Sequence, residues 1–171
     1  TTFDQSMGTV PIIYANLDSD ITIEGSHFKN GVLAFYEINN ANLVSKKNDF
    51  TSITNIVMME IHSNYKGYSN TITGANVYGF VQMRSTLYSE NDKYTGPAAP
   101  TTMFMVSSDG FLEVHKMVAD HVDNSVFVAA QFGGKALIYD TLANFAGTAV
   151  LFSVDSTITS INSSIPLSKV T

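Results

Sequence analysis

The chain has no cysteine, no tryptophan and few charges. Without cysteine it can form no disulfide, Cys-ligated zinc site or iron–sulfur cluster, and it has no cysteine nucleophile. Only 14% of its residues are charged, against about 25% in ordinary soluble domains, and Arg84 is the single arginine. Nucleic-acid binding needs a concentrated field of Lys and Arg, whereas this chain has a formal net charge of −6. We therefore expect no nucleic-acid partner.

Long apolar runs and catalytic motifs are also missing. No run of about 18 apolar residues is present, which predicts no membrane insertion, and the segment from Thr1 to Asp4 does not resemble a signal peptide. The sequence contains no GxSxG, HExxH or GxGxxG motif and no phosphate-binding loop. Its aspartates are numerous enough to form chance pairs, and most are expected in turns. We predict a non-enzymatic protein with no catalytic residue and no cofactor.

The histidines do not form a metal-ligand pattern. His115 and His121 are six residues apart, which on one strand separates them by about 20 Å at ~3.3 Å per residue. On a helix they would be neither three nor four residues apart, the spacings that bring two ligands to one ion. The sequence therefore predicts no metal site.

Small neutral polar residues are abundant instead. The chain has 18 Ser, 17 Thr and 14 Asn, together with 11 Phe and 8 Tyr. Ser, Thr and Asn favour strands and turns over helix interiors, because their side chains compete for backbone hydrogen bonds. A surface of such residues also has few charges to desolvate, so it suits packing against copies of itself.

Short apolar segments alternate with turn signals at a spacing of roughly ten residues. This cadence predicts an all-β fold, an antiparallel β-sandwich or jelly roll of about nine to eleven short strands with at most one or two short helices. Ser108-Asp109-Gly110, flanked by apolar runs, is the clearest hairpin signal. No internal repeat at a fixed period is evident. We expect an N-terminal arm or edge segment over 1–25 and the sandwich domain over 26–171.

Two segments allow both strand and helix. Residues 113–123 alternate as a strand does, but Val114, Met117, Val118, His121 and Val122 also fit a helical stripe. The neighbouring hairpin signal favours the strand. Residues 136–145 indicate a strand, with a short helix ending at Gly147 as the alternative.

Tyrosines in the predicted loops are candidates for binding. A tyrosine offers a flat apolar ring and a hydroxyl, which suits both sugar stacking and protein interfaces. The same residues could simply cap the ends of a sandwich. The candidate binding residues are Tyr65, Tyr68, Asn70, Tyr88 and Tyr94.

The two ends of the chain suggest an oligomer. Ile158, Ile161 and Ile165 are spaced three and four residues apart, a short pattern that could line a symmetry axis. Near the N-terminus, Ile12 and Tyr14 belong to a short apolar segment with a proline, which predicts an edge strand or docking arm. The sequence predicts a homo-oligomer, with a trimer favoured; an ordinary last strand is the alternative for the isoleucines.

The middle of the chain resembles the distal head domains of bacteriophage tail fibres. The resemblance covers 56–132 and lies in the order of a strand with a Gly-Tyr-Ser-Asn loop (67–70), a long strand (77–88) and a Ser-Asp-Gly turn before Phe111. It implies a β-sandwich homotrimer that recognises a host surface glycan or protein through loops, without catalysis.

From these observations we expect a self-associating structural protein of the virion, such as a tail fibre or receptor-binding tip. Its partners would be copies of itself, other virion proteins and a host glycan or protein. One alternative is a capsid or capsid-decoration protein. Another is a secreted or cell-surface carbohydrate-binding module, or a small β-sandwich hydrolase.

Overall fold

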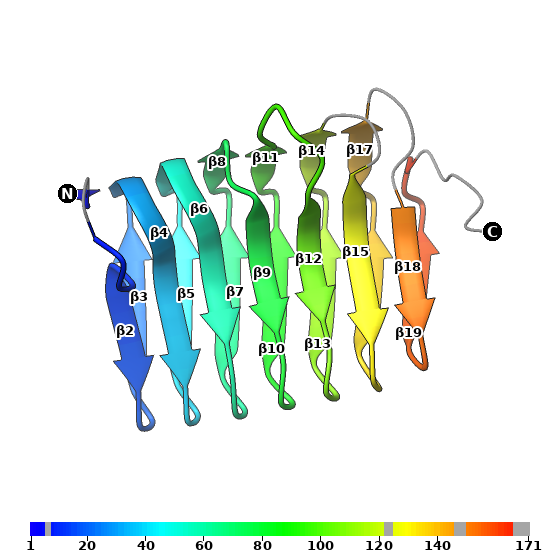
Figure 1. Cartoon of the computed structure of the whole chain (residues 1–171), viewed down its shortest axis with the longest axis horizontal. Coiled ribbons are helices and arrows are strands. Elements are labelled where there is room, and N and C mark those ends of the chain that lie inside the picture. The colour runs from blue at the N-terminus through cyan, green and yellow to red at the C-terminus, as the bar shows by residue number, and fades with distance from the viewer. Residues whose placement is uncertain (6–7, 122–124, 146–149, 166–171) are drawn as a thin grey trace.

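The computed structural model describes residues 1–5, 8–121, 125–145 and 150–165 and shows a parallel β-solenoid (Figure 1). The all-β prediction is confirmed, but the antiparallel β-sandwich or jelly roll is wrong. Neighbouring strands pair in parallel, in one seven-stranded and one twelve-stranded sheet. The chain winds through about seven coils, each adding one strand to the seven-stranded sheet.

The described residues form 19 strands and no helix, so the predicted nine to eleven strands were too few. The strands are β1 (Thr2–Asp4), β2 (Ile13–Asn16), β3 (Asp20–Glu24), β4 (His27–Ile38), β5 (Asn42–Lys46), β6 (Asp49–Met59), β7 (Asn64–Tyr68), β8 (Thr71–Thr73), β9 (Val77–Val81), β10 (Thr86–Glu90), β11 (Lys93–Thr95), β12 (Thr102–Val106), β13 (Phe111–His115), β14 (Val118–His121), β15 (Val126–Gln131), β16 (Lys135–Tyr139), β17 (Leu142–Phe145), β18 (Val150–Val154) and β19 (Thr157–Ile161).

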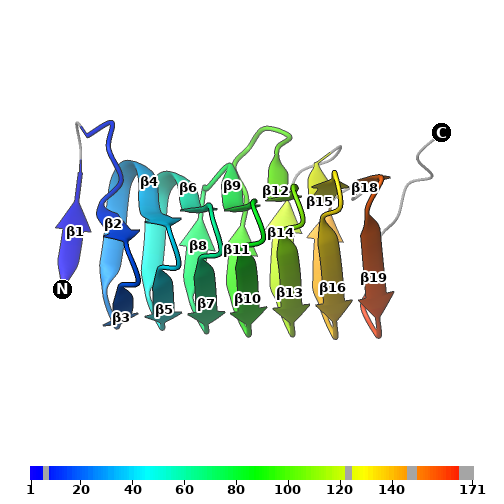
Figure 2. The ribbon, with the colours of Figure 1, turned by 90° about the horizontal axis from the view of Figure 1, so that it is seen from below.

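Each coil has three sides, which Figure 2 shows from below. The back side in Figure 1 is the seven-stranded sheet, in the order β19-β16-β13-β10-β7-β5-β3. The short-strand side contains β1, the first parts of β4 and β6, and β8, β11, β14 and β17. The long-strand side contains β2, the second parts of β4 and β6, and β9, β12, β15 and β18. Because β4 and β6 run through both of these sides, the two ladders join into the twelve-stranded sheet.

A repeat of 22 residues underlies the first coils, contrary to the expectation of no internal repeat. The long-strand and back sides meet at a turn with two consecutive positive φ angles, at 17–18, 39–40, 61–62 and 83–84. The next such turn lies at Ser108 and Asp109, because the coil that starts at Met83 is three residues longer than its predecessors. That turn joins β12 to β13, which lie in different sheets, so the predicted hairpin at 108–110 is also wrong.

The solenoid interior combines stacked rings with a ladder of polar side chains. Phe3, Phe28 and Phe50 stack on successive coils with centroids 4.7 and 5.0 Å apart. At the corner between the back and short-strand sides, one backbone N–H in each of three successive coils donates to a side-chain oxygen 22 residues further along the chain. The donors and acceptors are Ser26 to Asn48 (2.8 Å), Asn48 to Asn70 (3.0 Å) and Asn70 to Asp92 (2.6 Å). The buried turn is stabilised because its N–H groups keep partners.

Both segments with helical alternatives contain strands. Residues 113–121 belong to β13 and β14, separated by a turn at Lys116, where φ is positive. Residues 136–145 contain most of β16 and all of β17, and the proposed cap Gly147 lies outside the described residues. At the N-terminus, β1 and β2 pair with β4, and β3 pairs with β5.

Candidate functional site

The outer surface of the seven-stranded sheet carries a connected group of polar and aromatic side chains. Its strands alternate strictly: in β10, Leu87 and Ser89 are buried, while Thr86, Tyr88 and Glu90 lie on the outer face. In-register parallel pairing repeats this alternation in every coil, so outward positions form straight columns along the solenoid. The sheet thereby aligns residues that are 22 or more positions apart in sequence.

Four aromatic side chains form a continuous row on this face, which we call the aromatic row: Tyr68, Tyr88, His115 and Tyr139. Successive ring centroids are 5.7, 5.4 and 4.7 Å apart. The side chain of Lys46 extends the row, with its Nζ 5.9 Å from the ring centroid of Tyr68. At ~4.8 Å between strands, the row from β5 to β16 is about 19 Å long.

The rings contact one another, and two of them interact with neighbouring carboxylates. His115 and Tyr139 are nearly parallel, with an interplanar angle of 16°, so each covers one face of the other. The Tyr88 hydroxyl donates to Glu90 (3.0 Å), and His115 Nε2 lies 2.7 Å from Glu113 Oε1. Burial and Glu90 raise the pKa of Tyr88 to about 12, so its hydroxyl keeps its proton. The row can therefore bind through hydrogen bonds at its ring edges.

Charges of both signs flank the aromatic row. Lys46 and Lys66 lie at its N-terminal end, and Glu90 and Glu113 lie beside its centre. On the same face, the amides of Asn42 and Asn64 form a ladder with Asp20, at 3.0 Å per hydrogen bond. Donors and acceptors thus alternate along a surface held by a rigid sheet.

The candidate binding residues from the sequence separate into two groups. Tyr68 and Tyr88 lie together on the outer face, as part of the aromatic row. Tyr65, Asn70 and Tyr94 are buried inside the solenoid, where the Tyr94 hydroxyl donates to the carbonyl of Ala75 (2.5 Å). The structure therefore brings only the first two to a surface that a ligand can reach.

Asp92 is the hub of a buried polar cluster rather than part of a surface site. It accepts hydrogen bonds from the Asn70 backbone (2.6 Å), the Tyr78 hydroxyl (2.5 Å) and the Ser89 hydroxyl (2.7 Å). Burial raises the pKa of Asp92 to about 6, against the opposing effect of these hydrogen bonds. A side chain at Gly67 would collide with this cluster, since an added Cβ would lie 2.5 Å from the Tyr78 hydroxyl.

Burial also raises the pKa of Glu37 well above its usual range. Neither of its carboxylate oxygens has a hydrogen-bond partner within the described part of the chain. The carboxyl is enclosed by the core, so it is placed to hold a proton and not to meet a substrate.

The predicted interface residues lie on different parts of the molecule. Ile158, Ile165 and Ile12 pack against the core as partly buried residues. Ile161 is exposed on the outer face of β19, and Tyr14 is exposed on the long-strand side, at 53% of its surface. The three isoleucines therefore do not form one stripe, because Ile161 points away from the face that holds the other two.

Within the described ranges, no three His, Asp or Glu side chains lie close enough together to hold a metal ion. His27 Nδ1 lies 3.0 Å from an Asp49 carboxylate oxygen, but the pair has no third such neighbour in the described part of the chain. The described residues also include no helix that is long and apolar enough to cross a membrane.

Sequence reasoning missed His115 and Tyr139 as neighbours of Tyr68 and Tyr88. They belong to later coils, and β10 pairs with β13 at a spacing of 25 residues rather than 22. The signal that could have found them is the column of small residues at the turn: Ser19, Ala41, Ser63, Ser85, Gly110 and Gly134. Aligning the coils on this column places Tyr68, His115 and Tyr139 at the same position.

Comparison with known proteins gives no relative: no family model matches the sequence, and no curated protein or solved structure matches it. The function must therefore be argued from the geometry.

Proposed function

We propose that the protein is a non-catalytic recognition protein that binds a neutral, extended polysaccharide along the aromatic row. The observation that carries the proposal is the unbroken contact from Tyr68 through Tyr88 and His115 to Tyr139 on an outward sheet face. A linear polymer can lie along such a row. Tyr68, His115 and Tyr139 occupy the same position of their coils, and Tyr88 fills the gap between Tyr68 and His115 from a position two residues earlier, where Glu90 holds the equivalent place.

The chemistry of the face fits hydroxyl-rich sugars. A sugar hydroxyl both donates and accepts, and the face offers carboxylates beside Tyr88 and His115, phenol hydroxyls, and the ammonium groups of Lys46 and Lys66. Because the rings are held against one another, ordering them for a ligand costs little conformational entropy.

The charges argue against a polyanionic ligand. Glu90 and Glu113 lie at the centre of the aromatic row, and the chain has a formal net charge of −6. An approaching uronate or phosphate polymer would meet these carboxylates first and be repelled. We therefore assign the face to neutral glycans.

The virion role stays a prediction from the sequence. The sandwich implied by the resemblance to tail-fibre head domains is replaced by a solenoid, and the aromatic row does not depend on that resemblance. Recognition of a host glycan in a virion and recognition of a glycan at a cell surface both agree with the proposed ligand.

Affinity electrophoresis tests the proposal. The protein is run in native gels containing mixed-linkage β-glucan, xyloglucan, galactomannan, dextran or, as the anionic comparison, alginate. We expect retardation by at least one neutral polysaccharide and none by alginate. Tyr88→Ala and Tyr139→Ala should each weaken the retardation about tenfold or more, because the first change interrupts the row and the second shortens it.

Thr95→Ala is the matched control, since Thr95 is exposed on the short-strand side and lies outside the aromatic row. It should bind as the unmodified protein does. Mobility that no neutral polysaccharide changes would refute the proposed function. Retardation that survives both tyrosine substitutions would show that the glycan binds elsewhere.

A further inference from the structure

The long-strand side carries a second continuous row, made of apolar residues. These side chains occupy one outward column on successive coils, and each residue pairs directly with the next. We call this the apolar row: Tyr14, Tyr36, Met58, Phe80, Met105 and Ala129, with Phe152 as the paired position on β18.

Charge is almost missing from this side. The neighbouring column, which continues the pairing two residues further on, contains Asn16, Ile38, Glu60, Gln82, Ser107 and Gln131, so Glu60 is its one charged residue in the described coils. The Tyr36 hydroxyl donates to that carboxylate at 3.2 Å. Covering this side would therefore require little desolvation of charge.

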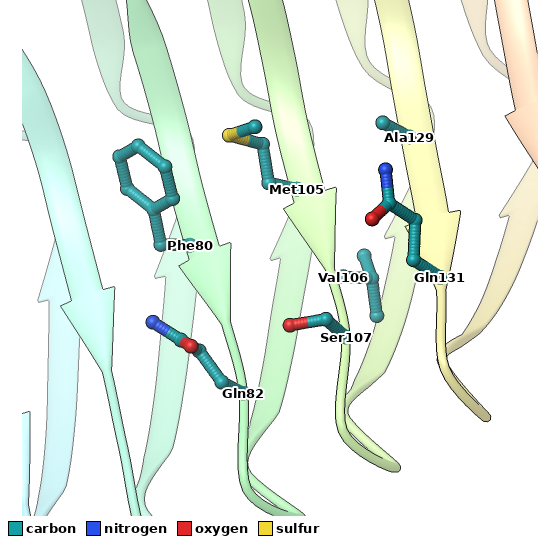
Figure 3. A pocket seen from close by; sticks show the side chains of 7 residues that line it. All are labelled: Phe80, Gln82, Met105, Val106, Ser107, Ala129 and Gln131. Atoms are coloured by element: carbon teal, nitrogen blue, oxygen red, sulfur yellow. The ribbon is translucent and has the colours of Figure 1, made fainter.

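The apolar row is uneven along its length. At its first position Tyr14 is 53% exposed. From the middle of the row onward, Phe80, Met105 and Ala129 line a shallow hollow of about 200 Å³, with Gln82, Ser107 and Gln131 at its edge (Figure 3). Ala129 is the smallest side chain in the row, so the sheet surface is lowest where it lies.

We propose that a second copy of this chain docks on the long-strand side in a two-fold, antiparallel arrangement. An axis through Phe80, the middle of the seven paired positions, exchanges the two ends of the row, so that Tyr36 of each copy lies over Ala129 of the other. The same rotation sets Met58 against Met105. The Tyr36 rings thus cover the hollows beside Ala129.

The size of the face agrees with a reversible dimer. Seven strands at ~4.8 Å and about five residues at ~3.3 Å give a face of about 34 Å by 16 Å, or about 540 Å² in projection. Exposed Leu17, Ile61 and Met83 adjoin it at the turn and enlarge it. This lies near the lower end of specific interfaces, about 600 Å² per partner, so we expect a dissociation constant in the micromolar range.

Sedimentation velocity over a series of protein concentrations tests the dimer. The unmodified protein should pass from monomer to dimer in the micromolar range. Met105→Lys should raise the dissociation constant at least 100-fold, because it buries an unpaired charge at the interface. Val44→Lys is the matched control: it adds the same charge to an outward strand position on the back side, and it should dimerise normally.

The two-fold register has its own test. Tyr36→Glu and Ala129→Lys should each weaken self-association, whereas an equimolar mixture of the two variants should regain dimers, because Glu then faces Lys across the axis. Circular dichroism confirms that each variant is folded. A monomer at all concentrations, a trimer, or a dimer unaffected by Met105→Lys would each overturn the proposal.

Discussion

The back and long-strand sides of the solenoid are built on the same parallel ladders but differ in chemistry. The back side displays tyrosines, a histidine, and lysines and glutamates that form hydrogen bonds at their tips. The long-strand side displays Met58, Phe80 and Met105 in line, with Glu60 as the one charge of the neighbouring described column. Backbone pairing holds the fold together on both sides, so the outward columns are free to differ.

This difference indicates two roles for one scaffold. A face rich in donors and acceptors keeps its hydration until a polar ligand replaces the water, whereas an apolar face gains free energy by being covered. In the proposed dimer the long-strand sides meet, and the two aromatic rows remain exposed on the outer surfaces. The dimer would then hold two glycan chains.

The largest predicted effect is on the stability of the fold and concerns Asp92. Its carboxylate accepts hydrogen bonds from Tyr78 on the long-strand side and from Ser89 on the back side. Its pKa is raised from 3.8 to about 6 by burial, so the folded protein binds this proton more tightly than the unfolded chain does. Stability from this group therefore falls as pH rises from about 4 to about 6, by about 3 kcal/mol at 1.36 kcal/mol per pKa unit.

Asp92→Asn should remove that pH dependence, since an amide does not titrate. Glu37 contributes equally in both proteins, so the difference between their urea unfolding free energies from pH 4 to pH 7 isolates Asp92. Glycan binding and dimerisation should both be unchanged in this variant, since the buried Asp92 belongs to neither row. Parallel pH profiles for the two proteins would show that Asp92 is ionised in the fold.

A smaller effect is expected from Gly67→Ala. The added methyl group would lie 2.5 Å from the Tyr78 hydroxyl and 2.7 Å from Asp92 Oδ2, so the buried cluster must shift. We expect a loss of about 1–3 kcal/mol in the free energy of unfolding, measured in urea. Glycan binding and dimerisation should then fail together at the lower melting temperature. An unchanged stability would show that the interior is looser than the structure indicates.

The smallest effect sharpens the description of the aromatic row. Tyr88→Phe keeps the ring in contact with Tyr68 and His115 but removes the hydroxyl that donates to Glu90. The loss of one hydrogen bond, about 0.5–1.5 kcal/mol, should weaken glycan retardation a few-fold and leave dimerisation unchanged. A loss as large as that in Tyr88→Ala would mean that the hydroxyl, and not the ring, carries the contact.

Local sequence signals could predict the strands but not their pairing. The alternation in 111–115 and 135–139 identifies strands with one buried face, as found. Ser108-Asp109-Gly110 suggested a hairpin because it is a turn sequence between two apolar runs, and Ser108 and Asp109 do adopt positive φ, as the central residues of a type I′ turn do. In the solenoid the same local conformation leads the chain into another sheet, and only contacts with the coils on either side distinguish the two outcomes.

The repeat was hidden because its corner positions tolerate many residue types. The positive-φ turn is Asn39-Asn40 in one coil and Ile61-His62 in the next, and neither contains glycine. Later coils also change length, since Lys93 pairs with Val118 at a spacing of 25 residues. The sequence therefore identified Tyr68 and Tyr88 as separate candidates in predicted loops, whereas they lie in strands β7 and β10 and are neighbours in one row.

In this account the back side binds glycan and the long-strand side forms the dimer. Light scattering tests this division most directly, on a mixture of the protein with a polysaccharide that retards it in native gels. A dimer with two outward aromatic rows should cross-link long chains and raise the scattered intensity. Met105→Lys should bind the same polysaccharide in gels without raising the scattering, and Tyr88→Ala should do neither. Cross-linking by the Met105→Lys variant at the level of the unmodified protein would contradict the account.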